Sequence, residues 1–421
     1  MATRIIRFFI VILLSSLLGY YVGTHKVSFE WKKFQPSLGI INKEPPSRID
    51  PIDFSLFWKA WERLETSYYD KKSLDSQKFL DGAIGGMVGS LGDPFTIYLP
   101  PVKNQEFKQG LAGQFEGIGA SLGIRGNQIV VVAPLPGSPA QKAGVRAGDG
   151  ILKVNEESTV GWTPAQAVEK IRGPKGTTVT LTVLHKSESV PVAIPIIRDT
   201  IIVESVIGWV KAIQDIEGID RKKFSDSQKQ NKIVYIHLSQ FGDNTNQEWP
   251  KLVNSLALQA ASDKRVKGLV FDLRDNPGGY LADAVFIASE FLEQGVIVSQ
   301  ERGNGERTQF VVNRKGLLTK IPLIVLMNKS SASSSEIVAS ALRDHKRATI
   351  VGETSYGKGT IQEALDLGNG AGLHVTVAKW LSPNGVWLNG KGIAPDIQIQ
   401  LDSKNASADA QLEYAIQELL E

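Results

Sequence analysis

The chain of 421 residues contains no cysteine, so it has no disulfide, no thiolate nucleophile and no cysteine ligand for a metal. Histidine is scarce as well. None of the five histidines lies in a G-x-S-x-G or H-E-x-x-H motif, and their positions are His25, His185, His237, His345 and His374. These absences disfavour cysteine peptidases, serine hydrolases with a nucleophile elbow of that type and zinc peptidases. No metal cluster is visible in the sequence, and no cofactor is expected.

An excess of charge of one sign is also missing. The formal net charge is +3, from 47 Lys and Arg against 44 Asp and Glu. No strongly basic surface is therefore implied, and nucleic acid is not an expected partner. The length indicates two or three domains, and 42% hydrophobic residues are enough for sizeable cores.

A long uncharged apolar stretch, residues 8–22, follows Arg4 and Arg7. Its length lies between that of a signal-peptide core and that of a short membrane span. Because no A-x-A cleavage site follows it, we expect an uncleaved membrane anchor over residues 1–25, with the basic end inside and the rest of the chain outside. A cleaved signal peptide is the alternative. In both cases the prediction is an extracytoplasmic protein, on the periplasmic or extracellular face.

Residues 26–104 are predicted to form a tether followed by a helical region. The spacing of apolar and aromatic residues indicates helices over residues 54–69 and 78–91. An aromatic stripe at helical spacing usually packs in a core, so this region is assigned no chemistry.

The sequence pattern changes between residues 105–198 and residues 199–421. The first part has short alternating strands between Gly and Pro turns, with two short helical pieces. The second part alternates strands with helices, which implies βαβ units and a largely parallel sheet. Residues 211–232 are charged and poor in large apolar residues, which favours a solvated surface insertion. Pro250 is expected in the first turn of a helix over residues 248–262.

The stretch of residues 328–362 carries the candidate chemistry. A serine cluster follows a short apolar strand and opens a predicted helix, and a glycine-rich turn further on carries Lys358. A hydroxyl at the start of a helix and a lysine among small residues suit a nucleophile and its base. The base must be neutral, and burial lowers the pKa of a lysine. The alternatives are that Ser333 with Glu336 is only an S-x-x-E capping box, and that Lys358 is a solvated loop lysine.

Residues 352–358 also fit the pattern G-x-x-x-x-G-K of a nucleotide-binding loop. In such a loop the next residue is Ser or Thr, which holds Mg²⁺, and a helix begins at the lysine. Here the next residue is Gly359, and the following GTIQEAL is only weakly helical. A P-loop-like nucleotide-binding protein is therefore a disfavoured alternative.

The segments SSASSSEIVASALRD and VGETSYGKGTIQ together resemble the core signature of the C-terminal processing proteases, or tail-specific proteases. This family consists of serine peptidases with a Ser/Lys dyad. The resemblance implies that Ser333 is the nucleophile, that Lys358, 25 positions later, is the base, and that Gln362 orients the lysine amine. It also implies a crotonase-like α/β spiral for the catalytic core. Ser334 stands where the family usually has alanine.

The segment DLRDNPGG, residues 272–279, resembles the family loop that supplies an oxyanion donor. We expect the backbone N–H groups of Gly279 and Ser334 to form the oxyanion hole; an ordinary turn is the alternative for Gly279. Asp344 lies eleven residues along the helix, about 16 Å from Ser333, which is too far for a direct relay.

Three segments between residues 115 and 184, FEGIGASLG, PGSPAQKAGVRAGDGILKVN and IRGPKGTTVTLTV, together resemble a PDZ domain. In such domains the amides of a glycine-rich loop hold a C-terminal carboxylate, and the peptide adds as a strand. The matching residues are Gly117, Ile118, Gly119 and Ala120, for which a simple tight turn is the alternative.

These features predict a membrane-anchored serine endopeptidase that cleaves exported proteins near or from their C-terminal ends. The expected partners are proteins or peptides with apolar C-terminal tails, and a homo-oligomer is compatible with the sequence. An inactive PDZ scaffold that only binds protein tails is the alternative, and intact Ser333, Lys358 and Gln362 argue against it.

Overall fold

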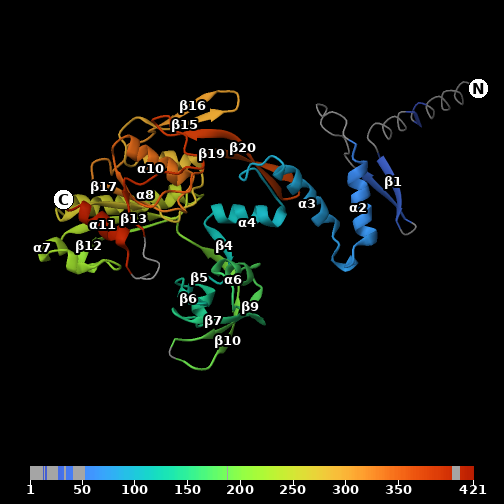
Figure 1. Cartoon of the computed structure of the whole chain (residues 1–421), viewed down its shortest axis with the longest axis horizontal. Coiled ribbons are helices and arrows are strands. Elements are labelled where there is room, and N and C mark those ends of the chain that lie inside the picture. Colours follow the sequence, from blue (N-terminus) through green and yellow to red (C-terminus); the bar gives the residue numbers. More distant parts are fainter. Residues whose placement is uncertain are drawn as a thin grey trace, which may run out of the picture. The chain divides into compact units, whose positions relative to one another are not determined.

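The computed structural model describes residues 13, 15–16, 27–32, 35–40, 53–186, 188–400 and 408–421. They belong to two compact units, residues 1–76 and 77–421 (Figure 1). Within the described residues, no helix is both long enough and apolar enough to cross a membrane. The apolar stretch of residues 8–22 lies almost wholly outside the described residues, so the membrane anchor stays a prediction.

The first unit contains a two-stranded antiparallel sheet and one long helix. The strands are β1 (Val27–Lys32) and β2 (Gln35–Ile40), and the helix α2 (Ser55–Ser67) confirms the helix predicted over residues 54–69. A short 3-10 helix, η1 (Lys71–Ser73), follows. No residue of α2 is buried, and Trp58 is 60% exposed. The expectation that its aromatic stripe packs in a core is therefore wrong for the described residues.

The second unit begins with helices that lead into its two domains. The helix α3 (Ser76–Gly89) confirms the one predicted over residues 78–91. A further helix, α4 (Pro101–Leu111), was not predicted, because its polar sequence shows no apolar period. Pro101 at its first position suits a helix start, and the Asn104 side chain donates a hydrogen bond to the Gly370 carbonyl at 2.8 Å.

The β-rich module predicted over residues 105–198 is present as an antiparallel sheet in the order β10-β9-β7-β6-β5, with β8 beside β7. Thr163 caps the second helix of this module with a complete capping box. A separate pair joins β4 to β11. The elements are β4 (Gln114–Gly117), β5 (Ala120–Arg125), β6 (Gln128–Pro134), α5 (Pro139–Lys142), β7 (Gly150–Val154), β8 (Glu157–Ser158), α6 (Pro164–Ile171), β9 (Thr178–Leu184), β10 (Val192–Ile197) and β11 (Asp199–Ile202).

The rest of the unit is built on a largely parallel sheet, as predicted, in the order β12-β13-β14-β17-β18-β21. Only the edge strand β12 runs antiparallel to its neighbour in this sheet. The strands are β12 (Val206–Ala212), β13 (Lys232–Leu238), β14 (Val266–Asp272), β17 (Leu323–Met327), β18 (Thr349–Gly352) and β21 (Ile397–Gln398).

A second, antiparallel sheet of this unit was not predicted. Its order is β16-β15-β20-β19, and β3 pairs with β20. The strands are β3 (Ile97–Leu99), β15 (Val296–Arg302), β16 (Arg307–Val311), β19 (Thr360–Gly368) and β20 (Ala371–Leu381). Because β19 starts two residues after Lys358, the segment after the lysine is a strand and not the helix that a nucleotide-binding loop requires.

Alternate residues of the parallel strands point to opposite faces of the sheet, and each face has its own cover. Leu269 and Phe271 of β14 pack with the helices α8 (Thr245–Ser262), α9 (Leu281–Ala288) and α10 (Ser334–Asp344). Val270 faces the other way and packs with the C-terminal helix α11 (Ala410–Glu418), red in Figure 1. Since α8 begins at Thr245, Pro250 lies inside the helix and not in its first turn as predicted.

The prediction that residues 211–232 form a solvated surface insertion holds for most of its charged side chains, which are exposed, but is wrong for its apolar ones. They contain η2 (Ile213–Asp215), η3 (Arg221–Lys223) and α7 (Asp226–Lys229), and Ile213, Ile216 and Phe224 are buried. These side chains share a hydrophobic cluster with the α11 residues Leu412, Ala415 and Ile416. The apolar surroundings of the insertion are thus supplied in part by a helix far later in the chain.

Candidate active site

Ser333 lies at a sharp turn between β17 and α10. It is the N-cap of α10 and has a φ of 56° and a ψ of −114°. A non-glycine residue with such a positive φ costs about 1–3 kcal/mol and is found mainly at functional sites. Gly278 makes room for the turn, because a Cβ at that position would lie 2.7 Å from the Ser333 Cβ. The turn therefore holds the hydroxyl-bearing residue in a strained but well-supported conformation.

The Glu336 carboxylate joins the turn at Ser333 to the loop that carries Lys358. Its Oε2 accepts the N–H groups of Ser333 and Lys358, both at 2.9 Å, and its Oε1 accepts the Gly357 N–H at 2.7 Å and the Ser355 hydroxyl at 2.5 Å. Glu336 is 0% exposed. Its contact with the Ser333 N–H is one half of the predicted capping box. The contacts with residues 355–358 were missed, because nothing in a local motif indicates a partner 19 to 22 positions away.

Replacing Glu336 with glutamine is expected to destabilise the protein and to slow any reaction at this site. The amide keeps one acceptor oxygen and turns two N–H donors toward groups that are themselves donors. Loss of hydrogen bonds to a buried charged group costs about 1.5–3 kcal/mol each. Urea unfolding should show a free energy of unfolding lower by about 2–3 kcal/mol or more. An unchanged midpoint and an unchanged kcat would contradict the joining role of this carboxylate.

Lys358 is held from two sides by aromatic residues. Its carbonyl accepts the Trp380 Nε1–H at 2.8 Å, and the next carbonyl, of Gly359, accepts the Trp387 Nε1–H at 2.9 Å. Its Nζ lies 5.1 Å from the centre of the Phe95 ring. Burial lowers the pKa of Lys358, although the negative charges of Asp93 and Glu336 act in the opposite direction. The lysine is thus shifted toward the neutral form that a base requires.

Gln362 lies on β19, and its side chain is fixed by two threonines. Its Nε2 donates to the Thr360 hydroxyl at 2.8 Å and to the Thr376 hydroxyl at 3.0 Å. Both amide hydrogens are therefore used, and the carbonyl oxygen is left as the atom that can accept a proton donor. Between the described side chains of Ser333, Lys358 and Gln362 the structure shows no direct hydrogen bond, so the predicted contact of Gln362 with the lysine amine stays a prediction.

Gly279 and Ser334 lie side by side at the start of α10. The Ser334 hydroxyl donates to the Gly279 carbonyl at 2.9 Å and to the Tyr280 carbonyl at 3.2 Å. Gly279 has a φ of 142°, and a Cβ there would collide with the Phe241 carbonyl, so only glycine fits. No hydrogen bond within the described residues uses the N–H of Gly279 or Ser334. Both amides are available to a ligand.

Ser334→Ala is expected to lower kcat about threefold to tenfold and to leave KM almost unchanged. The hydroxyl fixes the Gly279 peptide, and a net hydrogen bond of this kind contributes about 1 kcal/mol. Steady-state kinetics on one peptide substrate would measure the change. Ser340→Ala on the same helix is the matched control, because its hydroxyl bonds only to the Ile337 carbonyl. Equal losses in both variants would show that the effect is general to the helix.

A cavity of about 400 Å³ brings the predicted catalytic residues together. Ser333, Ser334, Gly279, Lys358 and Gln362 all line it. Most of the remaining wall is apolar or aromatic, with Phe95, Ile97, Phe107, Leu111, Ile337 and Trp380. Sequence reasoning missed these wall residues because they come from five separate elements or loops.

Asp344 and His374 lie at different positions relative to the cavity. Asp344 accepts the Ser382 hydroxyl at 2.6 Å and the Asn384 N–H at 3.0 Å, so it holds a loop, as expected of a residue too far from Ser333 for a relay. His374 lines the cavity, and its pKa is lowered by burial and by the nearby charge of Lys358. Among the described residues, no group of three or more His, Asp or Glu side chains is placed to hold a metal ion.

The glycine-rich loop of the β-rich module lines a separate groove. Gly117, Ile118, Gly119 and Ala120 lie there beside side chains of β5 and α6, among them Leu122, Val168 and Arg172. Gly119 has a φ of 69°, and a Cβ there would lie 2.6 Å from the Ser138 Cβ, so the loop requires glycine. The carbonyls of Ile118 and Gly119 accept the N–H groups of Ala140 and Leu135, which fixes the loop with its amides directed away from these partners.

Comparisons with known proteins agree with this architecture. Residues 232–399 match the model of peptidase family S41, residues 109–184 match the PDZ domain, and residues 15–101 match the N-terminal domain of the activating protease CtpB. Carboxy-terminal processing protease CtpA of Bacillus subtilis is 36% identical over 82% of this chain and 68% of its own length. Carboxy-terminal processing protease CtpB of the same organism is 34% identical over 91% of this chain and 74% of its own length.

A solved structure of the photosystem II D1 C-terminal processing protease is also similar. It shares 29% sequence identity with a TM-score of 0.50, and the match covers 82% of this chain and 92% of that one. The mixed α/β fold with PDZ and peptidase domains is confirmed. The chain belongs to the carboxy-terminal processing proteases of peptidase family S41, and it is a serine peptidase with a PDZ domain.

Proposed function

We propose that Ser333 and Lys358 form the catalytic dyad of this peptidase. The observation that carries the proposal is the Glu336 carboxylate, whose Oε2 accepts the N–H groups of both residues and so fixes them on one cavity. In this mechanism neutral Lys358 accepts the Ser333 hydroxyl proton while the serine oxygen attacks the scissile carbonyl. Lys358 then gives the proton to the departing amine, and water later releases the acyl group by the same route.

The N–H groups of Gly279 and Ser334 are proposed to bind the oxyanion of the tetrahedral intermediate. Two free amides at a helix N-terminus are suited to developing negative charge. Gln362 is proposed to accept a hydrogen bond from the Lys358 amine through its carbonyl oxygen, because its two N–H groups are engaged by threonines. A neutral amide orients the amine without adding a negative charge that would raise the lysine pKa.

The substrate is proposed to be a protein with an apolar C-terminal tail. The aromatic and aliphatic walls of the cavity favour an apolar side chain next to the scissile bond. Gly117, Ile118, Gly119 and Ala120 are proposed to hold the terminal carboxylate through backbone amides, with Leu122 and Val168 facing the tail.

Anchoring through residues 8–22 and an extracytoplasmic location are also proposed, on the basis of the sequence alone. Full release of the protein from membranes by a high-pH wash would overturn the anchor.

The proposed function is tested with an unstructured protein that ends in an apolar tail and with a fluorophosphonate that labels nucleophilic serines. We expect cleavage of the protein and a label on Ser333, located by peptide mass spectrometry. A label on another serine would overturn the dyad. Amidation of the substrate tail should reduce kcat/KM, and indifference to amidation would remove only the role assigned to the PDZ loop.

A further inference from the structure

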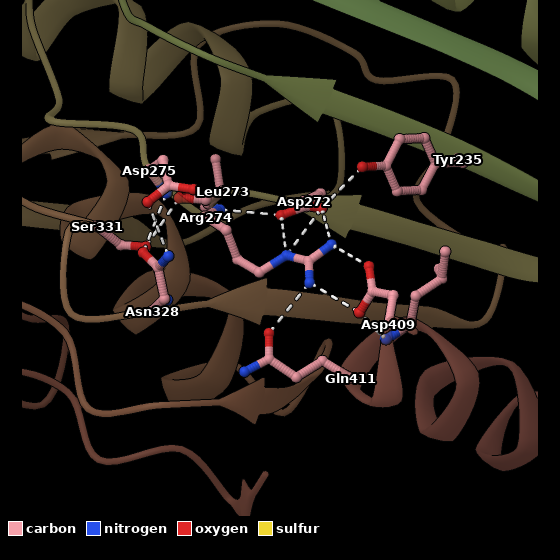
Figure 2. A network of polar contacts seen from close by, with 10 residues as sticks. Tyr235, Asp272, Leu273, Arg274, Asp275, Asn328, Ser331, Asp409 and Gln411 are labelled. Carbon is pink, nitrogen blue, oxygen red and sulfur yellow. Dashed lines mark hydrogen bonds and ion pairs between the residues drawn. The ribbon is translucent and has the colours of Figure 1, made fainter. Parts of the chain in front are cut away.

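A buried arginine on the loop before Gly279 contacts the C-terminal helix (Figure 2). Arg274 follows β14 by two positions, and its side chain is only 11% exposed. Its guanidinium donates to the carboxylates of Asp272 and Asp409, with Nη2 at 2.5 and 2.8 Å from their Oδ2 atoms. Burial lowers the pKa of Arg274, but hydrogen bonds to Asp272 and the charges of both carboxylates raise it well above its usual range. The arginine therefore stays charged at every pH at which the protein is folded.

The C-terminal helix contributes two acceptors to this network. Asp409 is the N-cap of α11, and its carboxylate accepts the Leu412 N–H at 2.9 Å and both Nη groups of Arg274. Gln411 is 0% exposed; its Oε1 accepts Arg274 Nη1 at 3.1 Å, and its Nε2 donates to the Ile399 carbonyl at 2.7 Å. The first turn of α11 is thus attached to Arg274 by three hydrogen bonds (Figure 2).

On the other side of Arg274, Asp272 fixes the start of the loop to the sheet. Asp272 ends β14, accepts the Arg274 N–H at 2.9 Å and accepts the Tyr235 hydroxyl of β13 at 2.7 Å. The next residue but two, Asp275, exchanges hydrogen bonds with the Asn328 side chain on the segment that leads to Ser333.

From there the loop is tied to the catalytic turn through Asn276. Its carbonyl accepts the Ala332 N–H at 3.0 Å and the Ser335 hydroxyl at 2.9 Å. Its Oδ1 accepts the Gly278 N–H at 2.9 Å. Hydrogen bonds together with the backbone of residues 272–276 therefore link the first turn of α11 through Arg274 to Gly278, which lies beside Ser333.

We propose that Asp409 and Gln411 on the C-terminal helix are positioning residues for the peptidase reaction, which act through Arg274 on the loop that presents the Gly279 N–H. This inference rests on the oxyanion role proposed for Gly279. No residue of α11 lines the cavity at Ser333. The helix limits how far the loop can move when negative charge develops on the substrate, and so it affects the transition state more than substrate binding.

The test compares Asp409→Asn and Gln411→Met with the wild type in the full-length protein. Asparagine is as good an N-cap as aspartate, so the start of α11 is preserved while the ion pair with Arg274 is lost. We expect kcat to fall about tenfold in Asp409→Asn and about threefold in Gln411→Met, with KM nearly unchanged. These losses are smaller than the loss of about 10²–10³ in kcat that follows removal of an oxyanion donor. The rate of labelling of Ser333 by a fluorophosphonate should fall in the same order.

Glu413→Gln is the matched control. Glu413 lies on the same turn region of α11 and accepts the Asp220 N–H and the Lys223 ammonium, so it attaches the helix to residues 213–229 without contacting Arg274. We expect it to lower the melting temperature and to leave kcat unchanged. The inference is overturned if folded Asp409→Asn and Gln411→Met keep the wild-type kcat, or if Glu413→Gln loses as much kcat as they do. If Asp409→Asn does not fold, Gln411→Met alone decides.

Failure of this inference is distinct from failure of the dyad. Labelling of a serine other than Ser333 in the wild type would remove the proposed function itself. Normal labelling of Ser333 with unaffected kinetics in both α11 variants would remove only the positioning role.

Discussion

Ser333→Ala is expected to lower kcat by about 10⁶-fold, to the background of the assay, because removal of the nucleophile of a serine peptidase has an effect of this size. The variant should still fold and bind substrate, since alanine keeps the Cβ and the backbone N–H that donates to Glu336. Cleavage of an unstructured protein with an apolar tail measures the loss, and fluorescence anisotropy of a labelled peptide measures binding.

Ser333→Gly separates catalysis from stability at the same position. Glycine adopts a φ of 56° without strain, so we expect an equally inactive protein that unfolds with a free energy higher by up to about 1 kcal/mol. A stabilised and inactive glycine variant would mean that the strain at Ser333 serves the site. Either variant retaining proteolysis would exclude Ser333 as the nucleophile.

Lys358→Met is expected to lower kcat by about 10²–10⁴-fold, the usual contribution of a general base. In the wild type, kcat/KM should rise with pH through the lysine pKa, because only the neutral amine accepts the serine proton. Burial lowers that pKa, so the midpoint of the rise should lie below the ordinary lysine value of about 10.4. Methionine should abolish the rise, and a midpoint at or above the ordinary value would contradict the assignment.

The free energy of unfolding should also increase as the pH rises through the pKa of Lys358. A lysine whose pKa is lowered by folding binds more protons in the unfolded state, so its contribution to stability increases between its folded pKa and about 10.4. Below that window the buried amine destabilises the fold. Lys358→Met should therefore be at least as stable as the wild type at pH 7, which thermal unfolding would measure.

Removal of a negative charge near Lys358 should shift the pH profile of kcat/KM in one direction. The negative charges of Asp93 and Glu336 raise the pKa of Lys358, and the effect of Asp93 is the larger of the two. Asp93→Asn should move the rise in kcat/KM to lower pH. Asp81→Asn removes the same charge from a residue that bonds to Tyr98, and should leave the profile unchanged. Burial and the charge of Lys358 lower the pKa of His374, which favours its neutral form.

Much of the fold was predictable where the pattern is local. The alternation of strands with helices after residue 199 and the short apolar run at β17 were identified from neighbouring residues alone. The buried side of the insertion after β12 was missed because its few apolar residues, such as Phe224, pack with residues of α11 and of the parallel sheet, most of them distant in the chain. The helix α4 was missed because its sequence is polar and has no apolar period.

The candidate site was likewise predictable only where a local motif indicates it. Ser333 and Lys358 were predicted from a motif, but the motif does not show what holds them in register. That is the Glu336 carboxylate, whose four donors come from residues 333 and 355–358. The aromatic wall from Phe95, Phe107 and Trp380 and the link from α11 to Arg274 also lie outside any local pattern.

By itself the sequence determined the domain types, the parallel sheet and the candidate catalytic residues, because these depend on periodicity, turns and short motifs. Only the tertiary structure decided which carboxylate joins Ser333 to Lys358, which side chains line the cavity and which helix contacts Arg274. The physical reason is that a lysine pKa is lowered by burial, and burial requires segments that are distant in the chain to pack around the amine. The same packing excludes water from the hydrogen bonds of a buried carboxylate and so strengthens them.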